Sequence, residues 1–161
     1  MYYAASAITR YAGQEFPHMF LVEAKNDTEA AEVAEAVLRN WWEDEEMRIK
    51  DRRYFFFTDT YVVWLREVNA VSEATAKELQ TIHLLWLLTP PALDYREAYD
   101  LYEYVCEHGK EYASYKDAPP LPKDAERIAV DDDGRYRIIM HSGWPVAAEE
   151  TFNDVLFVYA L

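Results

Sequence analysis

Apolar and polar positions along this chain alternate in short strand-like runs, separated by stretches with helical spacing. Strands are predicted over residues 2–11 and 18–24, where Met19-Phe20-Leu21-Val22 is rich in β-favouring residues. The segment from Gly13 to Pro17 has the composition of a turn between these strands. We therefore expect the chain to begin with a β-hairpin.

The clearest helical pattern starts at Asn26, which can cap a helix with Glu29 as its capping-box partner. The apolar residues that follow recur every three or four positions, as on the buried face of a helix. They are Ala30, Val33, Ala34, Val37, Leu38 and Trp41. The pattern predicts a helix from about Asp27 to Asp44.

Two apolar runs follow, over residues 54–58 and 61–68, with Asp59 near the turn between them. Both runs carry too few polar residues for a strand with one face in water. We expect them to occupy a central position in a sheet, or a sheet that is covered on both faces.

A second helix is predicted from about Glu73, with Ser72 as its cap, and Thr89-Pro90-Pro91 as its end. Its last part, Ile82 to Leu88, is apolar all round and has to be either buried or an association surface. Burial in the core is the favoured interpretation. A homodimer seam is the alternative hypothesis.

A third helix is predicted from a capping box at Asp94 and Glu97 to about Glu107, with Gly109 suited to the position after its end. Its residues form two stripes. The apolar stripe consists of Tyr95, Ala98, Tyr102 and Val105, and the acidic stripe of Glu97, Asp100, Glu103 and Glu107.

The remaining residues favour strands. Prolines within 113–124 indicate an extended surface connection, and Asp132-Asp133-Gly134 predicts a hairpin between 127–130 and 136–141. We expect a helical turn over 147–153 and a buried strand over 155–161. Because hairpins dominate, we predict a single α+β domain over residues 1–161, with a mainly antiparallel sheet and about three helices.

The net charge of the chain indicates which kinds of partner it can bind. The 161 residues include thirty Asp and Glu against sixteen Lys and Arg, which gives a formal net charge of −14, and they include thirteen Tyr and five Trp. An acidic surface repels nucleic acid and anionic membranes and attracts basic proteins. We therefore expect a basic protein partner, with no direct contact to nucleic acid or membrane.

The number of cysteines and the length of the apolar runs indicate the cellular compartment of the protein. Cys106 is the only cysteine, so no intramolecular disulfide can form, which favours a reducing environment. The first residues lack a signal-peptide pattern, and the longest apolar run, Leu84 to Leu88, is too short to span a bilayer. We expect a soluble, cytoplasmic protein.

The motifs of common catalytic and cofactor sites are missing. There is no phosphate-binding loop, dinucleotide fingerprint, nucleophile elbow or zinc-protease helix. Acidic neighbours of Cys106 disfavour its thiolate. The Asp131–Gly134 run lacks the ligand pattern of a calcium loop, and no two histidines lie at metal-ligand spacing. We expect no cofactor, no metal and no enzymatic activity.

Acidic residues concentrate in particular segments. Residues 23–46 hold nine acids and 94–111 hold six, each against two basic residues. Two acidic helices side by side could approach the charge spacing of a nucleic acid strand, about 3.4 Å per phosphate. The expected contact residues are exposed acids, on the first helix Glu32, Glu35 and Glu43, and on the third Glu97, Asp100, Glu103 and Glu107.

These observations lead to the hypothesis of a nucleic-acid mimic that inhibits a basic, nucleic-acid-binding effector. Antirestriction and anti-CRISPR proteins of phages and mobile elements are of this kind, and the analogy is one of size and charge alone. An immunity protein or antitoxin that neutralises a basic toxin is an alternative. An enzyme whose site is assembled by tertiary folding is a second alternative. An acidic surface that only provides solubility is the simplest explanation.

Overall fold

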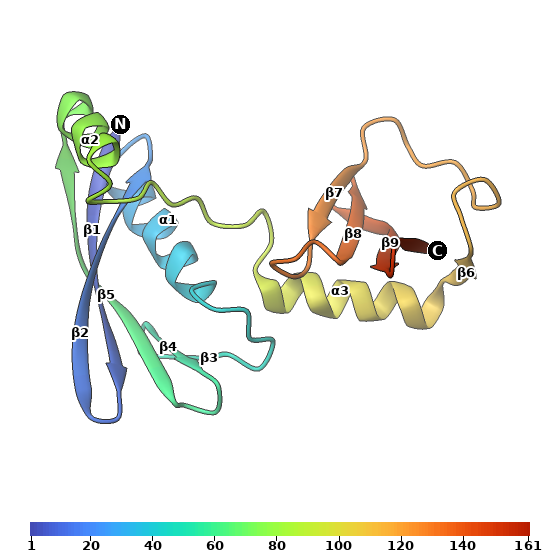
Figure 1. Cartoon of the computed structure of the whole chain (residues 1–161), viewed down its shortest axis with the longest axis horizontal. Coiled ribbons are helices and arrows are strands. Elements are labelled where there is room, and N and C mark those ends of the chain that lie inside the picture. The colour runs from blue at the N-terminus through green and yellow to red at the C-terminus, as the bar shows by residue number, and fades with distance from the viewer. The chain divides into compact units, whose positions relative to one another are not determined.

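Two five-stranded antiparallel sheets and three helices make up the computed structural model, which describes all 161 residues (Figure 1). The predicted α+β class is confirmed. The contacts within the chain divide it into two compact units, residues 1–94 and 95–161. The prediction that they form one domain stays a prediction.

The first unit contains a sheet with the strand order β2-β1-β5-β4-β3 and two helices. Its elements are β1 (Tyr2–Tyr11), β2 (Gln14–Glu23), α1 (Asp27–Arg39), β3 (Arg48–Lys50), β4 (Arg53–Phe56), β5 (Tyr61–Val71) and α2 (Glu73–Thr81). β5 is the longest strand and lies in the centre of the sheet, as its apolar sequence predicts. The short strand β3 was not predicted.

The N-terminal hairpin is confirmed, but its turn is tighter than predicted. Tyr11 pairs with Gln14, so only Ala12 and Gly13 form the turn, both with positive φ. Such two-residue turns match the twist of the flanking strands. Pro17 is therefore part of β2, where it is tolerated because β2 is an edge strand.

Asn26 caps α1 as predicted, but the Glu29 side chain accepts from the Lys25 backbone N–H instead of completing the capping box with Asn26. The Asn26 side chain accepts a hydrogen bond from the Glu29 backbone N–H at 2.9 Å. The predicted end of the helix at Asp44 is wrong. The helix ends at Arg39, and the side-chain amide of Asn40 donates to the Ala36 carbonyl at 2.8 Å. This side chain satisfies one of the carbonyls that a helix end leaves without a partner.

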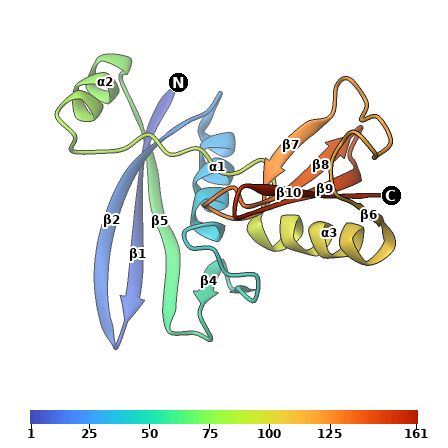
Figure 2. The same cartoon turned by 45° about the vertical axis from the view of Figure 1, so that its right-hand side comes forward.

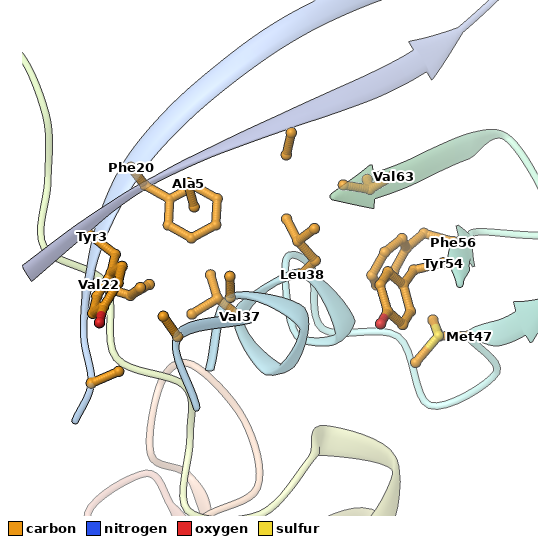
Figure 3. Close-up of a cluster of buried hydrophobic side chains, with 14 residues drawn as sticks. Tyr3, Ala5, Phe20, Val22, Val37, Leu38, Met47, Tyr54, Phe56 and Val63 are labelled. Carbon is orange, nitrogen blue, oxygen red and sulfur yellow. The ribbon is translucent and has the colours of Figure 1, made fainter. Parts of the chain in front are cut away.

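In the first unit α1 lies alongside the sheet (Figure 2), and the core lies between them, as the buried side chains in Figure 3 show. The apolar face of α1 is buried there as its spacing predicts. The largest fully buried side chains around it are Tyr3, Phe20, Leu38, Phe56 and Val63. These side chains come from β1, β2, α1, β4 and β5, so packing on α1 ties the sheet together.

The predicted continuation of α2 through Ile82–Leu88 is wrong. Ser72 caps the helix as expected, but it ends at Thr81, and the following chain lies beside β2. Leu21 donates to the Trp86 carbonyl at 2.8 Å and accepts from the Leu88 N–H at 2.9 Å. Hydrogen bonds of this edge strand therefore outweigh the helical tendency of the segment.

The interpretation of this segment as buried core is also wrong. Ile82, Leu84 and Trp86 are each exposed by 60% or more. Residues 82–85 form turns after α2, with His83 at positive φ, and these turns direct Ile82 and Leu84 into solvent before the chain reaches β2 at Trp86. The homodimer seam stays a prediction.

The second unit contains a sheet with the order β6-β10-β9-β8-β7 and one helix. Its elements are α3 (Tyr95–His108), β6 (Lys110–Tyr112), β7 (Glu126–Ala129), β8 (Tyr136–His141), β9 (Trp144–Phe152) and β10 (Val155–Ala160). The helix packs on β8, β9 and β10 through its predicted apolar stripe, of which Ala98, Tyr102 and Val105 are buried. The hairpin at Asp132-Asp133-Gly134 and the C-terminal strand are confirmed. The predicted burial of this strand is wrong for most of it, because only Val158 of β10 is buried and Val155 is exposed.

The predicted helical turn over 147–153 is wrong, because residues 147–152 belong to β9 and Asn153 lies in the turn that follows it. His141 pairs with Trp144 across a tight turn in which Ser142 and Gly143 both have positive φ. This turn sends the chain straight back along β8, and β10 then pairs with its other side. Ladder hydrogen bonds on both sides fix the segment as a strand.

Gly109 follows α3 as predicted, and its role is a close backbone approach. A Cβ at this position would lie 2.6 Å from the Val105 carbonyl oxygen and 3.0 Å from that of Ala160. Only glycine lets the end of α3 come this near to β10. It thereby allows β6 to join the sheet immediately after the helix.

Candidate acidic face and hollows

The four predicted acids of the third helix lie together on its exposed side. Glu97, Asp100, Glu103 and Glu107 are separated by three, three and four residues, which places them on one face of α3. All four are exposed. No ion pair of the structure involves them. We call this set the α3 acidic face.

The three acids assigned to the first helix do not form such a face. Glu32 lies on α1 and is exposed, as predicted. Glu43 is exposed but lies beyond the end of α1, so its placement on this helix is wrong. Glu35 was expected to be exposed and is buried, with 8% of the residue accessible.

Burial of Glu35 is compensated by two polar partners. The Arg52 guanidinium lies 3.0 Å from its Oε1, and the Tyr54 hydroxyl donates to its Oε2. Burial, together with this carboxylate, raises the pKa of Tyr54. The partners come from the turn and strand after β3, so helical periodicity alone could not reveal them.

A hollow of about 520 Å³ lies next to Glu35 on the first unit. Its lining residues are Thr28, Ala31, Glu32, Glu35, Arg39, Arg52 and Tyr54. Arg39 is paired with Asp94 at 3.2 Å, and Arg52 with Glu35. Because both cations and the buried carboxylate already have partners within the chain, the arrangement is that of a structural ion-pair network.

A second hollow, of about 430 Å³, lies beside the α3 acidic face and is named here the α3 hollow. Its lining residues are Tyr99, Tyr102, Glu103, Cys106, Glu107, Tyr136 and Glu150. Three phenol rings and three carboxylates thus border one space. Two of these carboxylates, Glu103 and Glu107, also belong to the α3 acidic face.

Strand register brings the sheet residues of the α3 hollow next to the helix. Tyr136 on β8 lies directly opposite Glu150 on β9, so both side chains point to the same face of the sheet. The ring of Tyr136 meets that of Tyr102 on α3 edge to face, with 5.3 Å between centroids. Sequence reasoning missed Tyr136 and Glu150, since only the register places them there.

Cys106 within the α3 hollow is not an activated nucleophile. Burial raises the pKa of its thiol, and the nearby Glu150 and Glu103 carboxylates act in the same direction, against a hydrogen bond with Tyr102. A reactive cysteine needs the opposite, a cationic environment that lowers the pKa. The structure therefore agrees with the interpretation from its acidic sequence neighbours.

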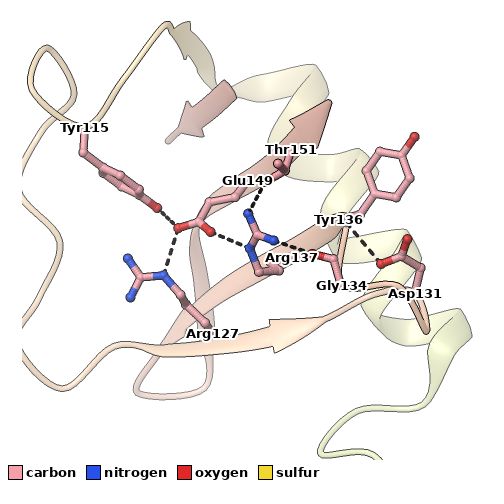
Figure 4. A network of polar contacts seen from close by, with 8 residues as sticks. All are labelled: Tyr115, Arg127, Asp131, Gly134, Tyr136, Arg137, Glu149 and Thr151. Atoms are coloured by element: carbon pink, nitrogen blue, oxygen red, sulfur yellow. Dashed lines mark hydrogen bonds and ion pairs between the residues drawn. The ribbon is translucent and has the colours of Figure 1, made fainter. Parts of the chain in front are cut away.

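The opposite face of the second sheet holds a buried carboxylate, Glu149, shown in Figure 4. Arg127 and Arg137 donate to it from 2.9 and 2.7 Å, and the Tyr115 hydroxyl donates as well. Burial acts to raise the pKa of Glu149, but the three hydrogen bonds lower it below its ordinary value. Acids of the C-terminal segment are therefore partly internal rather than part of an acidic surface.

The His, Cys, Asp and Glu side chains are not grouped so that they could hold a metal ion. The structure contains no group of three or more His, Cys, Asp or Glu placed to hold a metal ion. His141, for example, pairs with Asp124 at 3.0 Å, and His108 contacts the Tyr104 carbonyl.

No helix is both long enough and apolar enough to cross a bilayer.

Comparison of the chain with protein-family models, with curated proteins and with solved structures gives no match. The function is therefore inferred from the chemistry of the sites alone.

Proposed function

We propose that this protein is a non-enzymatic inhibitor that binds a basic, nucleic-acid-binding partner and blocks its nucleic acid site. One observation carries the proposal: the four carboxylates of the α3 acidic face are exposed and have no counterion within the chain. Buried acids of the same chain, by contrast, pair with arginines, as Glu35 and Glu149 do.

The spacing of the α3 acidic face suits a row of cations. Glu97 and Glu107 are ten residues apart, which corresponds to about 15 Å along a helix at 1.5 Å per residue. Four charges over this length give about one per 5 Å, against about one per 3.4 Å in a nucleic acid strand. Lys and Arg side chains that hold successive phosphates are flexible enough to reach carboxylates at this spacing.

The partner's class follows from the same charges. A net charge of −14 attracts cationic surfaces over several ångströms and speeds their encounter with this protein. Phage and mobile-element inhibitors of restriction or CRISPR effectors would use such a surface. An immunity protein or antitoxin against a basic toxin would use it too, and the identity of the bound partner separates these cases.

The experiment is affinity capture from the native host, followed by a competition assay with the captured protein. The test variant carries Glu97→Gln, Asp100→Asn, Glu103→Gln and Glu107→Gln. The matched control carries Glu23→Gln, Glu45→Gln, Glu67→Gln and Asp117→Asn, which are exposed acids outside any ion pair. Both variants have the same net charge, −14 + 4 = −10.

We expect the test variant to lose the partner and the control to keep it. Binding should weaken steeply between 0.05 and 0.5 M NaCl, because salt screens exposed charges. The wild-type protein should also displace nucleic acid from the captured partner. Equal capture by both variants, binding that does not depend on salt, or a partner that keeps its nucleic acid would each contradict the proposal.

A further inference from the structure

We propose that the α3 hollow is a recognition pocket for the guanidinium group of an arginine side chain on the partner. This inference rests on the proposed function, since it names the group that the basic partner inserts. It adds a specific site to the general attraction of the α3 acidic face.

The lining of the α3 hollow combines the two kinds of group that bind a guanidinium. Faces of the tyrosine rings attract a cation placed over them, and carboxylates accept two parallel N–H hydrogen bonds from arginine. Tyr99 and Tyr102 lie on α3 one turn apart, and Glu103 and Glu107 follow them on the same helix. Aromatic and acidic groups therefore border the same space.

An arginine of the chain already makes both contacts at the edge of this set. The guanidinium of Arg135 lies 5.0 Å from the centre of the Tyr136 ring and 3.2 Å from the Glu150 carboxylate. This internal pair shows how a guanidinium fits between a phenol ring and a carboxylate on this sheet. It also neutralises Glu150, so Glu103 and Glu107 are the carboxylates left for a ligand.

The energetics of α3 also favour a bound cation at this end. Glu103 and Glu107 are four residues apart, and like charges at this spacing destabilise a helix. Glu107 also lies in the last turn of α3, where the helix dipole disfavours negative charge. A guanidinium between them would offset both the repulsion between the two carboxylates and the unfavourable interaction with the helix dipole.

The volume agrees with a small organic group. A space of about 430 Å³ lies within the range of roughly 300–1,000 Å³ that is usual for small-ligand pockets. Arginine fits the lining better than lysine, because its planar guanidinium can stack on a ring while it bonds a carboxylate. A divalent cation would use the carboxylates and leave the tyrosines without a role.

The test is a titration of the full-length protein, followed by NMR of its backbone amides. N-acetyl-arginine amide is the probe, and N-acetyl-citrulline amide, which has nearly the same shape without the charge, is the control ligand. N-acetyl-lysine amide and calcium chloride form two further arms. We expect arginine amide to shift the amides around Tyr99, Glu103, Glu107 and Tyr136, and citrulline amide to leave them unchanged.

Variants assign the binding to the hollow. Glu103→Gln and Tyr99→Leu should each weaken arginine amide by at least about threefold, since each removes one attraction to the guanidinium. Asp117→Asn is the matched control, because it removes one exposed charge of the same unit at a residue that belongs neither to the α3 acidic face nor to the lining of the hollow. Using two variants guards against a local change in folding at Tyr99.

Several results would overturn this inference. They are equal shifts with arginine and citrulline amide, tighter binding of lysine amide or calcium at the same residues, or an effect of Asp117→Asn as large as that of Glu103→Gln. Its failure is distinguishable from that of the proposed function. If the variant without the α3 acidic face loses the partner but the wild-type protein does not bind arginine amide, the proposed function stands and the arginine pocket is refuted. If the wild-type protein binds arginine amide but captures no basic partner, the pocket stands and the proposed function is refuted.

Discussion

At the scale of single residues, two glutamates with ordinary sequence surroundings are buried in this acidic chain. Glu35 lies on α1 and pairs with Arg52 and Tyr54, and Glu149 lies on β9 and pairs with two arginines. Removing a carboxylate from water costs several kcal/mol unless hydrogen bonds and counterions compensate. Both sites provide this compensation through residues that are distant in the sequence.

Replacing Glu149 tests how much its network stabilises the second unit. Glu149→Gln should lower the free energy of unfolding by about 2–3 kcal/mol, less than for a fully buried pair because Arg127 is half-exposed and can be hydrated. Urea denaturation followed by circular dichroism measures this difference. An unchanged midpoint would mean that the ion pairs only balance the cost of burial.

The same network gives stability a defined dependence on pH. Because the folded-state pKa of Glu149 is lowered, its stabilisation is fully present above the ordinary value of 4.5. It is lost as the pH falls through the lower, folded-state pKa. The Glu149→Gln variant should therefore show a smaller loss of stability on acidification than the wild-type protein.

At the scale of elements, α3 carries its acids at positions with opposite effects on the helix. Glu97 lies in the first turn, where negative charge interacts favourably with the helix dipole, and Glu107 lies next to the last residue, His108. The α3 acidic face is thus unfavourable for the helix at one end only. A surface that binds cations can keep such a local cost because binding offsets it.

A pair of matched substitutions measures this asymmetry. Glu107→Gln should raise the free energy of unfolding by about 0.3–1 kcal/mol, since it removes repulsion from Glu103 and from the helix dipole. Glu97→Gln should lower it by a few tenths of a kcal/mol. Each variant has lost one negative charge, so net charge cannot explain a difference in sign. Changes of the same sign in low-salt urea denaturation would contradict the argument.

At the scale of the whole molecule, each of the two units has buried side chains of its own. The main apolar cluster lies entirely within residues 1–94, and a second set, including Val105, Ile138 and Val158, lies within residues 95–161. Separate cores are the usual basis for separate cooperative unfolding. The prediction of one domain from the sequence can therefore be tested directly.

Hydrogen exchange of the Glu149→Gln variant provides this test. If the units unfold separately, faster exchange should appear in residues 95–161 and leave the amides of 1–94 unchanged. If the chain is one cooperative domain, exchange should increase in both units to a similar extent. We expect the first result, because Glu149 and all its partners belong to the second unit.

Local signals account for the elements that the sequence determined. Side-chain capping at Asn26 and Ser72, the glycine turns at Gly13 and Gly134, and the spacing of the apolar stripe on α3 act within a few residues. The four acids of the α3 acidic face could be grouped from the sequence because a helix repeats every 3.6 residues. Their exposure followed from their position opposite the apolar stripe.

The remaining elements depend on pairing between segments that are distant in the sequence. Apolar content alone does not distinguish a buried helix from a strand, and pairing with β2 determines the extended conformation at Leu87. Residues 147–150 are Ala and Glu, which favour a helix, but pairing with β8 and β10 makes residues 147–152 part of a strand. Burial of Glu35 required Arg52 and Tyr54, and the α3 hollow required Tyr136 and Glu150 to face the helix. The sequence by itself determined the acidic charge, the α+β class and the row of carboxylates on α3. Only the tertiary structure decided which carboxylates keep their charge exposed, because counterions and aromatic neighbours come from strands distant in the chain.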